Sequence, residues 1–386
     1  MKSLNEQSSK SRMANLELLR CVAMMMVVVL HYLGKGNLLA DLTVENMGVV
    51  GTVAWVLEAF CIVAVNLYML ISGYFLCESS FKLSRLLGLW VQIWTYSVAV
   101  GLVAVAVGLV PAGEFTTYYL LQLIFPVSMG HYWFMTAYVF LYLLLPFVSV
   151  AVKRMTKSQL QITLGLLLFA FCLTKSILPV RLEMDAKGYD CLWYLCVFLT
   201  AAYIRKFGIP FLQKKGRGAL LYVAVVLLIF TGTMCLHLIY VKTGSLGLML
   251  KVLIEYNHVL PFLASVGLFT AFLRLNLSGK PARAVCRVAP YTLGVYLLHE
   301  NIGVRYEWQK WLGAERISGV GGLLLWTVLA VVVVFAAGVV TEAVRSLVMK
   351  GLHRVMLRLG LYRSIIEKID RADRLFGKTE DKEKVS

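Results

Sequence analysis

Two basic residues on one apolar stretch are the first feature of this sequence with chemical meaning. Arg20 and His31 lie in the apolar run 16–33. Their spacing advances ~16 Å along a helix and returns both side chains to within ~20° of one face. An arginine can bind phosphate groups, and a histidine can take a proton near neutral pH. Because ionisable side chains are costly in lipid, this face is expected to look into the protein or a polar path.

Other polar residues are expected at the same outer depth as His31. The stretch HYWF (131–134) supplies His131, Tyr132 and Trp133, and the stretch YTLGVYLLHEN (291–301) supplies His299 and Glu300. Aromatic rings with nearby polar groups can bind a sugar. Histidines on three different segments at one depth indicate a shared site.

Each of these residues also has a structural interpretation. Arg20 could anchor the inner end of a membrane helix, and His31 could be a hydrogen-bonded packing residue. Tyr132 and Trp133 could belong to an interfacial aromatic belt. The stretch LISGYF (70–75), followed by Lys82 and Arg85, is by itself a weak helix-packing signal. Glu58, Asn66, Glu255 and His258 are further polar residues in or near apolar segments.

The composition identifies the class of protein that must position these residues. Hydrophobic residues make up 60% of the chain and charged residues only 15%, with a mean hydropathy of +0.77. Too little polar surface remains to cover a soluble protein of 386 residues. We therefore predict an all-α, polytopic membrane protein.

Apolar stretches long enough to cross a bilayer recur about ten times. They lie at 16–33, 49–76, 85–110, 131–151, 159–179, 190–204, 218–240, 248–273, 286–304 and 319–343. The loops between them are short, so one membrane domain over 14–345 is expected, with a cytoplasmic segment over 1–13 and a tail over 346–386. The segment 115–127 is too short to span and is expected at the outer interface.

The charge distribution predicts the orientation. The net charge of +17 would suggest nucleic acid in a soluble protein, but most of the 38 Lys and Arg residues fall in segments on one side of the predicted spans. The positive-inside rule then puts both termini in the cytoplasm, and no nucleic-acid partner is expected. The tail is basic and amphipathic, which favours contact with an anionic inner leaflet. Its last dozen or so residues are expected to be disordered.

Cysteine and histidine spacing predicts neither a disulfide framework nor a metal centre. Most cysteines fall within or beside predicted spans. The sequence has no CxxC pair and no Cys/His spacing typical of a zinc site. We therefore expect no bound metal and no permanently bound cofactor.

The motifs in this order resemble the acyltransferase 3 family, integral membrane proteins that O-acylate surface polysaccharides and related glycans. The matching stretches are LELLRCVAMMMVVVLH with its R-x10-H spacing, YMLISGYF followed by Lys82 and Arg85, HYWFMTAYVFLYLLLPF, EYNHVLPFLASVGLF and YTLGVYLLHEN. The resemblance covers about residues 14–345. Glu17 stands where many relatives have Asp, and the hydrolase-like domain fused in some relatives is not seen, so this chain is expected to complete transfer within the membrane.

The resemblance implies acetyl-CoA or another acyl-CoA as donor and a polysaccharide or lipid-linked glycan as acceptor, at the cytoplasmic membrane of a bacterium. Arg20, helped by Lys82 and Arg85, is then expected to hold the donor phosphates. His31 would be the general base or carry the acyl group as an acyl-imidazole.

The remaining predicted site residues surround the acceptor. His299 would orient the acceptor or stabilise charge. Acceptor contacts are expected from Trp133, Tyr132, His131 and Glu300.

A rival interpretation is an exporter or flippase of a lipid-linked glycan. It would use the same basic and aromatic path without a base at a thioester. A sensory or scaffold protein is disfavoured by the number of polar residues within the spans. Whether one continuous cavity joins Arg20 to His31 and opens on both faces is the observation that would discriminate between these interpretations.

Overall fold

The computed structural model describes residues 13–178, 180, 182–183 and 185–377. Every long regular element in this part of the chain is a helix, so the predicted all-α class is confirmed. The expected N-terminal segment lies outside these residues except for Met13. The expected disorder of the last residues falls mostly outside them as well.

Eight helical segments of the described chain are long and apolar enough to cross a membrane. They comprise α1 (Ala14–Lys35), α2 with α3 (Gly48–Cys61 and Ala64–Leu76), α4 (Leu83–Ala106), α6 (Trp133–Arg154), α7 with α8 (Lys157–Leu168 and Thr174–Ile177), α10 (Arg217–Thr243), the segment Gly247–Leu273 that ends in α11 (Val259–Leu273), and α15 (Val320–Met356). This agrees with a polytopic membrane protein.

The two other predicted spans are shorter or interrupted helices. The span expected at 190–204 is α9 (Cys191–Phe207), which has 17 residues. The span expected at 286–304 contains α12 (Gly279–Val288) and α13 (Thr292–His299), separated by a 3-10 turn at Ala289–Tyr291.

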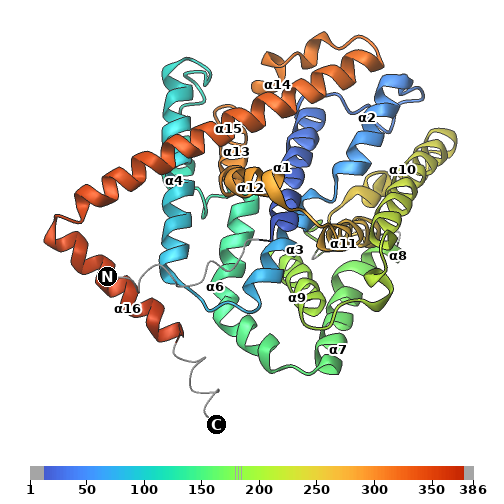
Figure 1. Cartoon of the computed structure of the whole chain (residues 1–386). Helices are drawn as coiled ribbons and strands as arrows, with labels where there is room; N and C mark the ends of the chain where they lie inside the picture. Colours follow the sequence, from blue (N-terminus) through green and yellow to red (C-terminus); the bar gives the residue numbers. More distant parts are fainter. Residues whose placement is uncertain (1–12, 179, 181, 184, 378–386) are drawn as a thin grey trace.

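Helix α1 lies at the centre of the bundle (Figure 1). It packs against α2, α3, α11, α12, α13 and α15. Much of its surface is buried, including Leu19, Val28 and Tyr32. Because α1 is one unbroken helix of 22 residues, the predicted alignment of Arg20 and His31 on one face holds.

Close helix contacts surround this centre. Gly73 of α3 meets α9 so closely that a Cβ there would lie 2.9 Å from the Cα of Phe198. Gly338 of α15 lies similarly close to the backbone of Val295 in α13. Small residues allow such backbone approach between membrane helices. These contacts fix α3 and α13, which carry several of the site residues, against their neighbours.

The remaining helices lie at the ends of the bundle. The segment expected at the outer interface contains α5 (Thr117–Ile124), and α14 (Trp308–Trp311) follows α13. The tail continues α15 to Met356 and then forms α16 (Gly360–Gly377). Helix α16 packs on the start of α4, where the Ser84 hydroxyl donates to Asp373 at 2.5 Å and the rings of Phe81 and Phe376 lie 4.9 Å apart.

Candidate active site

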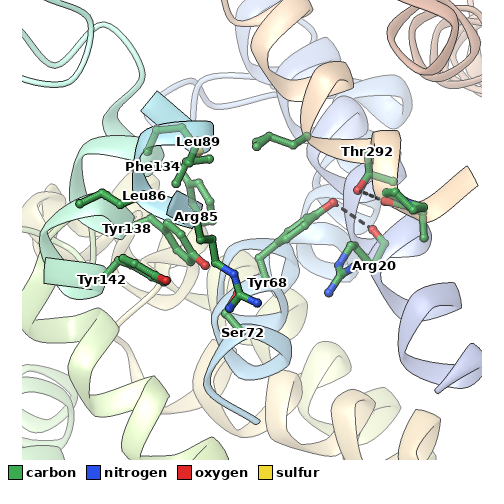
Figure 2. A pocket seen from close by; sticks show the side chains of 14 residues that line it. Arg20, Tyr68, Ser72, Arg85, Leu86, Leu89, Phe134, Tyr138, Tyr142 and Thr292 are labelled. Atoms are coloured by element: carbon green, nitrogen blue, oxygen red, sulfur yellow. Dashed lines mark hydrogen bonds between the residues drawn. The ribbon is translucent and has the colours of Figure 1, made fainter. Parts of the chain in front are cut away.

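The inner part of the site is a cavity of about 240 Å³ beside Arg20. Helices α3, α4, α6 and the α12–α13 turn line it, with Tyr68, Ser72 and Arg85 among the polar side chains. The guanidinium groups of Arg20 and Arg85 both point toward the end of the cavity where Ser72 lies (Figure 2). Two cations and a hydroxyl therefore share one concave space, which suits an anionic ligand.

Arg20 is paired with one carboxylate and remains partly exposed. Its Nη1 lies 2.8 Å from Glu17 Oε2, and 28% of its side chain remains exposed. The Tyr68 hydroxyl donates to the Arg20 backbone carbonyl at 3.0 Å, which ties α3 to α1 beside the cavity. Glu17 is therefore the residue that orients the guanidinium.

Lys82, the third residue of the predicted donor site, is not among the residues that line this cavity. It is the N-cap of α4, and its backbone exchanges hydrogen bonds with the Tyr142 hydroxyl. Its exposed side chain lies just before the first turn of α4. A role in donor binding stays a prediction for Lys82.

At the outer end of α1, the structure brings His31, His299 and Glu300 into contact. His31 Nδ1 lies 2.9 Å from His299 Nε2 and 3.1 Å from Glu300 Oε1. The Lys35 ammonium also pairs with Glu300 Oε1. His299 and Glu300 are buried, each only 3% exposed. Of the three histidines expected at a similar depth, His31 and His299 are thus in contact.

The hydrogen-bond partners determine where the ring protons lie. His299 Nδ1 is 2.6 Å from the Val295 carbonyl oxygen, which can only accept, so a neutral His299 has Nε2 as an acceptor. The hydrogen between the two rings must then sit on His31 Nδ1, which also faces the Glu300 carboxylate. His31 Nε2 is left with a free lone pair and no partner among the described residues. This is the arrangement of a base oriented by a carboxylate.

A second, narrower cavity of about 50 Å³ adjoins His31. Its lining includes Trp133, Tyr256 and Tyr296. It shares Tyr68, Phe134 and Leu293 with the inner cavity. The two cavities therefore adjoin at these three residues, between Arg20 and His31.

Together with Phe134, Trp133 is a member of the HYWF stretch that lines this cavity. Its ring lies 4.3 Å from the ring of Tyr189 and 6.0 Å from that of Tyr256, the latter stacked. Together these rings form an aromatic wall beside the cavity that contains His31. Such a wall can pack against a sugar ring or an acyl chain.

His131 and Tyr132 are buried and bonded to other parts of the protein. His131 Nε2 accepts from the Ile302 backbone N–H at 3.0 Å, and its Nδ1 lies 2.9 Å from Ser97 Oγ. The Tyr132 hydroxyl donates to the Leu297 carbonyl at 2.9 Å and accepts from Asn301 at 3.1 Å. Their roles in acceptor binding stay predictions, while their observed bonds join α6 to the segment after α13.

The other polar residues noted in the sequence have varied environments. Asn66 bonds to the Trp193 indole and the Tyr256 carbonyl, and His258 accepts from the Leu260 N–H at the start of α11. Glu255 pairs with Lys175. Glu58 is buried, and one of its carboxylate oxygens has no hydrogen-bond partner in the described chain.

The ligand atoms of His31, His299 and Glu300 lie within 4.8 Å of one another, a spacing that could hold a metal ion. The hydrogen bonds suit a different use of these groups. The Lys35 ammonium already neutralises the carboxylate, and His31 Nδ1 carries the proton that a metal would have to replace. The arrangement therefore favours proton transfer.

Lys35, Tyr296 and Tyr68 are among the site residues that were not predicted. Lys35 lies one helical turn after His31, so the (i, i+4) spacing was a usable signal. Tyr296 lies three residues before His299 within the quoted stretch YTLGVYLLHEN. Tyr68 begins the quoted stretch YMLISGYF, but only the packing of α3 against α1 shows that it lines both cavities.

Comparison with known proteins identifies the family of the chain. No curated protein and no solved structure matches the chain. The acyltransferase 3 family model, described as an acyltransferase domain, matches residues 13–342. This match includes both cavities, the whole of α1 and the cluster around His31. The chain therefore belongs to the acyltransferase 3 family and is a multi-pass membrane acyltransferase.

Proposed function

We propose that this protein transfers an acyl group, with acetyl the simplest case, from cytoplasmic acyl-CoA to a hydroxyl of an extracytoplasmic or lipid-linked glycan. The observation that carries the proposal is the environment of His31. Its Nδ1 faces His299 and Glu300, while the residue lines a cavity that adjoins the arginine-lined one.

The inner cavity is the proposed donor site. Acyl-CoA carries several phosphates, and the Arg20 and Arg85 guanidinium groups can hold them through charge-assisted hydrogen bonds. Lys82 would add attraction at the cytoplasmic entrance. The pantetheine arm would then extend past Tyr68 toward His31, ~16 Å farther along α1.

His31 is the proposed general base. Its Nε2 would remove the proton from the acceptor hydroxyl as the oxygen attacks the thioester carbon, and the resulting imidazolium would return a proton to the leaving thiolate. The buried Glu300 carboxylate would stabilise the imidazolium through Nδ1. His299, which accepts a bond from the same nitrogen, would keep the ring oriented.

An acyl-imidazole intermediate would use the same nitrogen as a nucleophile. In that route Nε2 attacks the thioester, thiolate leaves, and the acceptor hydroxyl then displaces the imidazole. Rapid quenching distinguishes the two routes, because only the second leaves labelled acyl groups on the protein before the acceptor is added.

The aromatic wall of Trp133, Tyr189 and Tyr256 is the proposed contact for the acceptor. Aromatic faces suit the apolar face of a sugar ring, and the wall lies on the His31 side of the route. The positive-inside rule supports an extracytoplasmic position for the His31 side of the route. We infer that the membrane is the cytoplasmic membrane of a bacterium. A glycan on a lipid carrier could reach it from the bilayer.

A glycan exporter would need a wide and continuous passage. The cavity beside His31 has a volume of only about 50 Å³, which gives more support to delivery of a narrow thioester arm. An exporter would also have no use for an acyl-CoA donor, to which the arginine-lined cavity is assigned in this proposal.

Label transfer tests the proposal. Inverted membrane vesicles from the source organism expose the cytoplasmic face and contain the natural acceptor, so radiolabelled acetyl-CoA can be added directly, with succinyl-CoA in parallel. We expect label in the glycan fraction that depends on this chain and is released by mild alkali, as an O-ester is. Equal labelling of vesicles that lack the chain would contradict the proposal.

A further inference from the structure

The Tyr296 hydroxyl is a buried polar group that the proposed mechanism has not used. Tyr296 is only 5% exposed, and its hydroxyl hydrogen has no acceptor among the described residues. The residue lines the cavity that also contains His31. A buried hydroxyl without a partner destabilises the fold, which suggests that its partner arrives with a ligand.

The rest of this cavity offers few acceptors for that hydroxyl. The lining consists largely of apolar and aromatic side chains, among them Met24, Val27 and Leu30. A ligand that enters must therefore supply the acceptor. The proposed thioester has one suitable atom, its carbonyl oxygen.

A helix N-terminus faces the same cavity. Trp133 and Phe134, the first two residues of α6, both line it. The N-cap residue, Tyr132, supplies no side-chain acceptor to the first turn of α6. The amide groups and the dipole at a helix N-terminus favour negative charge. Two independent features thus favour an anion at one place.

We propose that the Tyr296 hydroxyl and the N-terminal end of α6 form an oxyanion hole for the thioester carbonyl oxygen. This inference rests on the proposed acyl transfer. When the acceptor oxygen bonds to the carbonyl carbon, the π electrons move to the carbonyl oxygen, which becomes an oxyanion. His31 takes the acceptor proton. The oxyanion then collapses, the C–S bond breaks, and the thiolate takes the proton from His31 to give an ester and free CoA thiol.

The hydroxyl acts mainly when the charge develops, so it should affect turnover more than donor binding. Tyr296→Phe removes only this group and leaves the ring. We expect kcat for acyl transfer in the vesicle assay to fall about 10²-fold or more, as for other oxyanion donors. The donor KM should stay within about threefold of the wild-type value.

Tyr194→Phe is the matched control. Tyr194 is also fully buried, and its hydroxyl also lacks a partner, but the residue does not line the His31 cavity. Its kcat should stay close to that of wild type. An equal loss in both variants would mean that the hydroxyls serve folding and would overturn the inference.

Binding of S-ethyl-CoA, measured by calorimetry on the purified protein, provides a second readout. This thioether lacks the carbonyl oxygen, so wild type and Tyr296→Phe should bind it equally. Weaker binding by Tyr296→Phe, or an unchanged kcat, would overturn the oxyanion role. Absence of acyl transfer by the wild-type chain would instead refute the proposed function itself.

Discussion

Replacing Glu300 by glutamine tests whether a buried carboxylate supports the base. The substitution keeps the size of the side chain but removes the charge that faces His31 Nδ1 at 3.1 Å. With an effective dielectric constant of about 20, that charge stabilises an imidazolium at this distance by about 5 kcal/mol. Such an energy corresponds to between three and four powers of ten in rate.

The Lys35 cation reduces this benefit because it pairs with the same carboxylate oxygen. We therefore expect Glu300→Gln to lower kcat about 10²- to 10³-fold, with the donor KM little changed because the donor phosphates lie near Arg20. The assay is acyl transfer from labelled acetyl-CoA in inverted vesicles, normalised to the amount of folded protein.

Glu307→Gln is a suitable control for this prediction. Glu307 also pairs with a lysine, Lys310, at 3.1 Å, but it is more exposed and lies outside the His31 cluster. Its kcat should remain near the wild-type value, as surface ion pairs contribute little. If Glu300→Gln turns over within fivefold of wild type, the carboxylate does not support the base and the assignment is refuted.

Two further predictions concern the donor site and the orientation of the chain. Arg20→Ala should raise the donor KM at least tenfold. Arg20→Lys should restore the KM only in part, because an ammonium replaces a planar guanidinium that can donate two hydrogen bonds to one phosphate. An unchanged KM in Arg20→Ala would leave Arg20 as a membrane anchor. Lys187→Cys should react with an impermeant maleimide added outside intact cells, whereas Lys214→Cys should react no more than the parent chain does. Labelling of Lys214→Cys alone would show that the chain has the opposite orientation.

The sequence alone predicted the fold class and the shared face of Arg20 and His31 on α1. A strongly apolar sequence with basic loops leaves few alternatives to a helical membrane bundle. The alignment of Arg20 and His31 depends only on helix geometry, and α1 runs unbroken through both residues. The similar depth of His31 and His299 was predicted, whereas their contact comes from the structure.

The detailed roles of the site residues depend on contacts between distant segments. Glu300 was expected to face the acceptor, whereas it pairs with Lys35 and His31 from α1. The expected membrane depth of a residue, read from its position along a predicted span, cannot show which neighbouring helix its side chain faces. Likewise, the bonds of His131 and Tyr132 to backbone groups after and within α13 arise from packing that no local pattern encodes.

We propose that the chain transfers acyl groups with His31 as the base. A comparison of wild type with His31→Gln in the acetyl-CoA vesicle assay, at equal membrane abundance, tests this role most directly. Glutamine keeps hydrogen-bonding capacity but cannot take a proton near neutral pH, so the rate should fall about 10²- to 10⁴-fold. A stable His31→Gln protein that transfers acetyl groups at the wild-type rate would contradict the account.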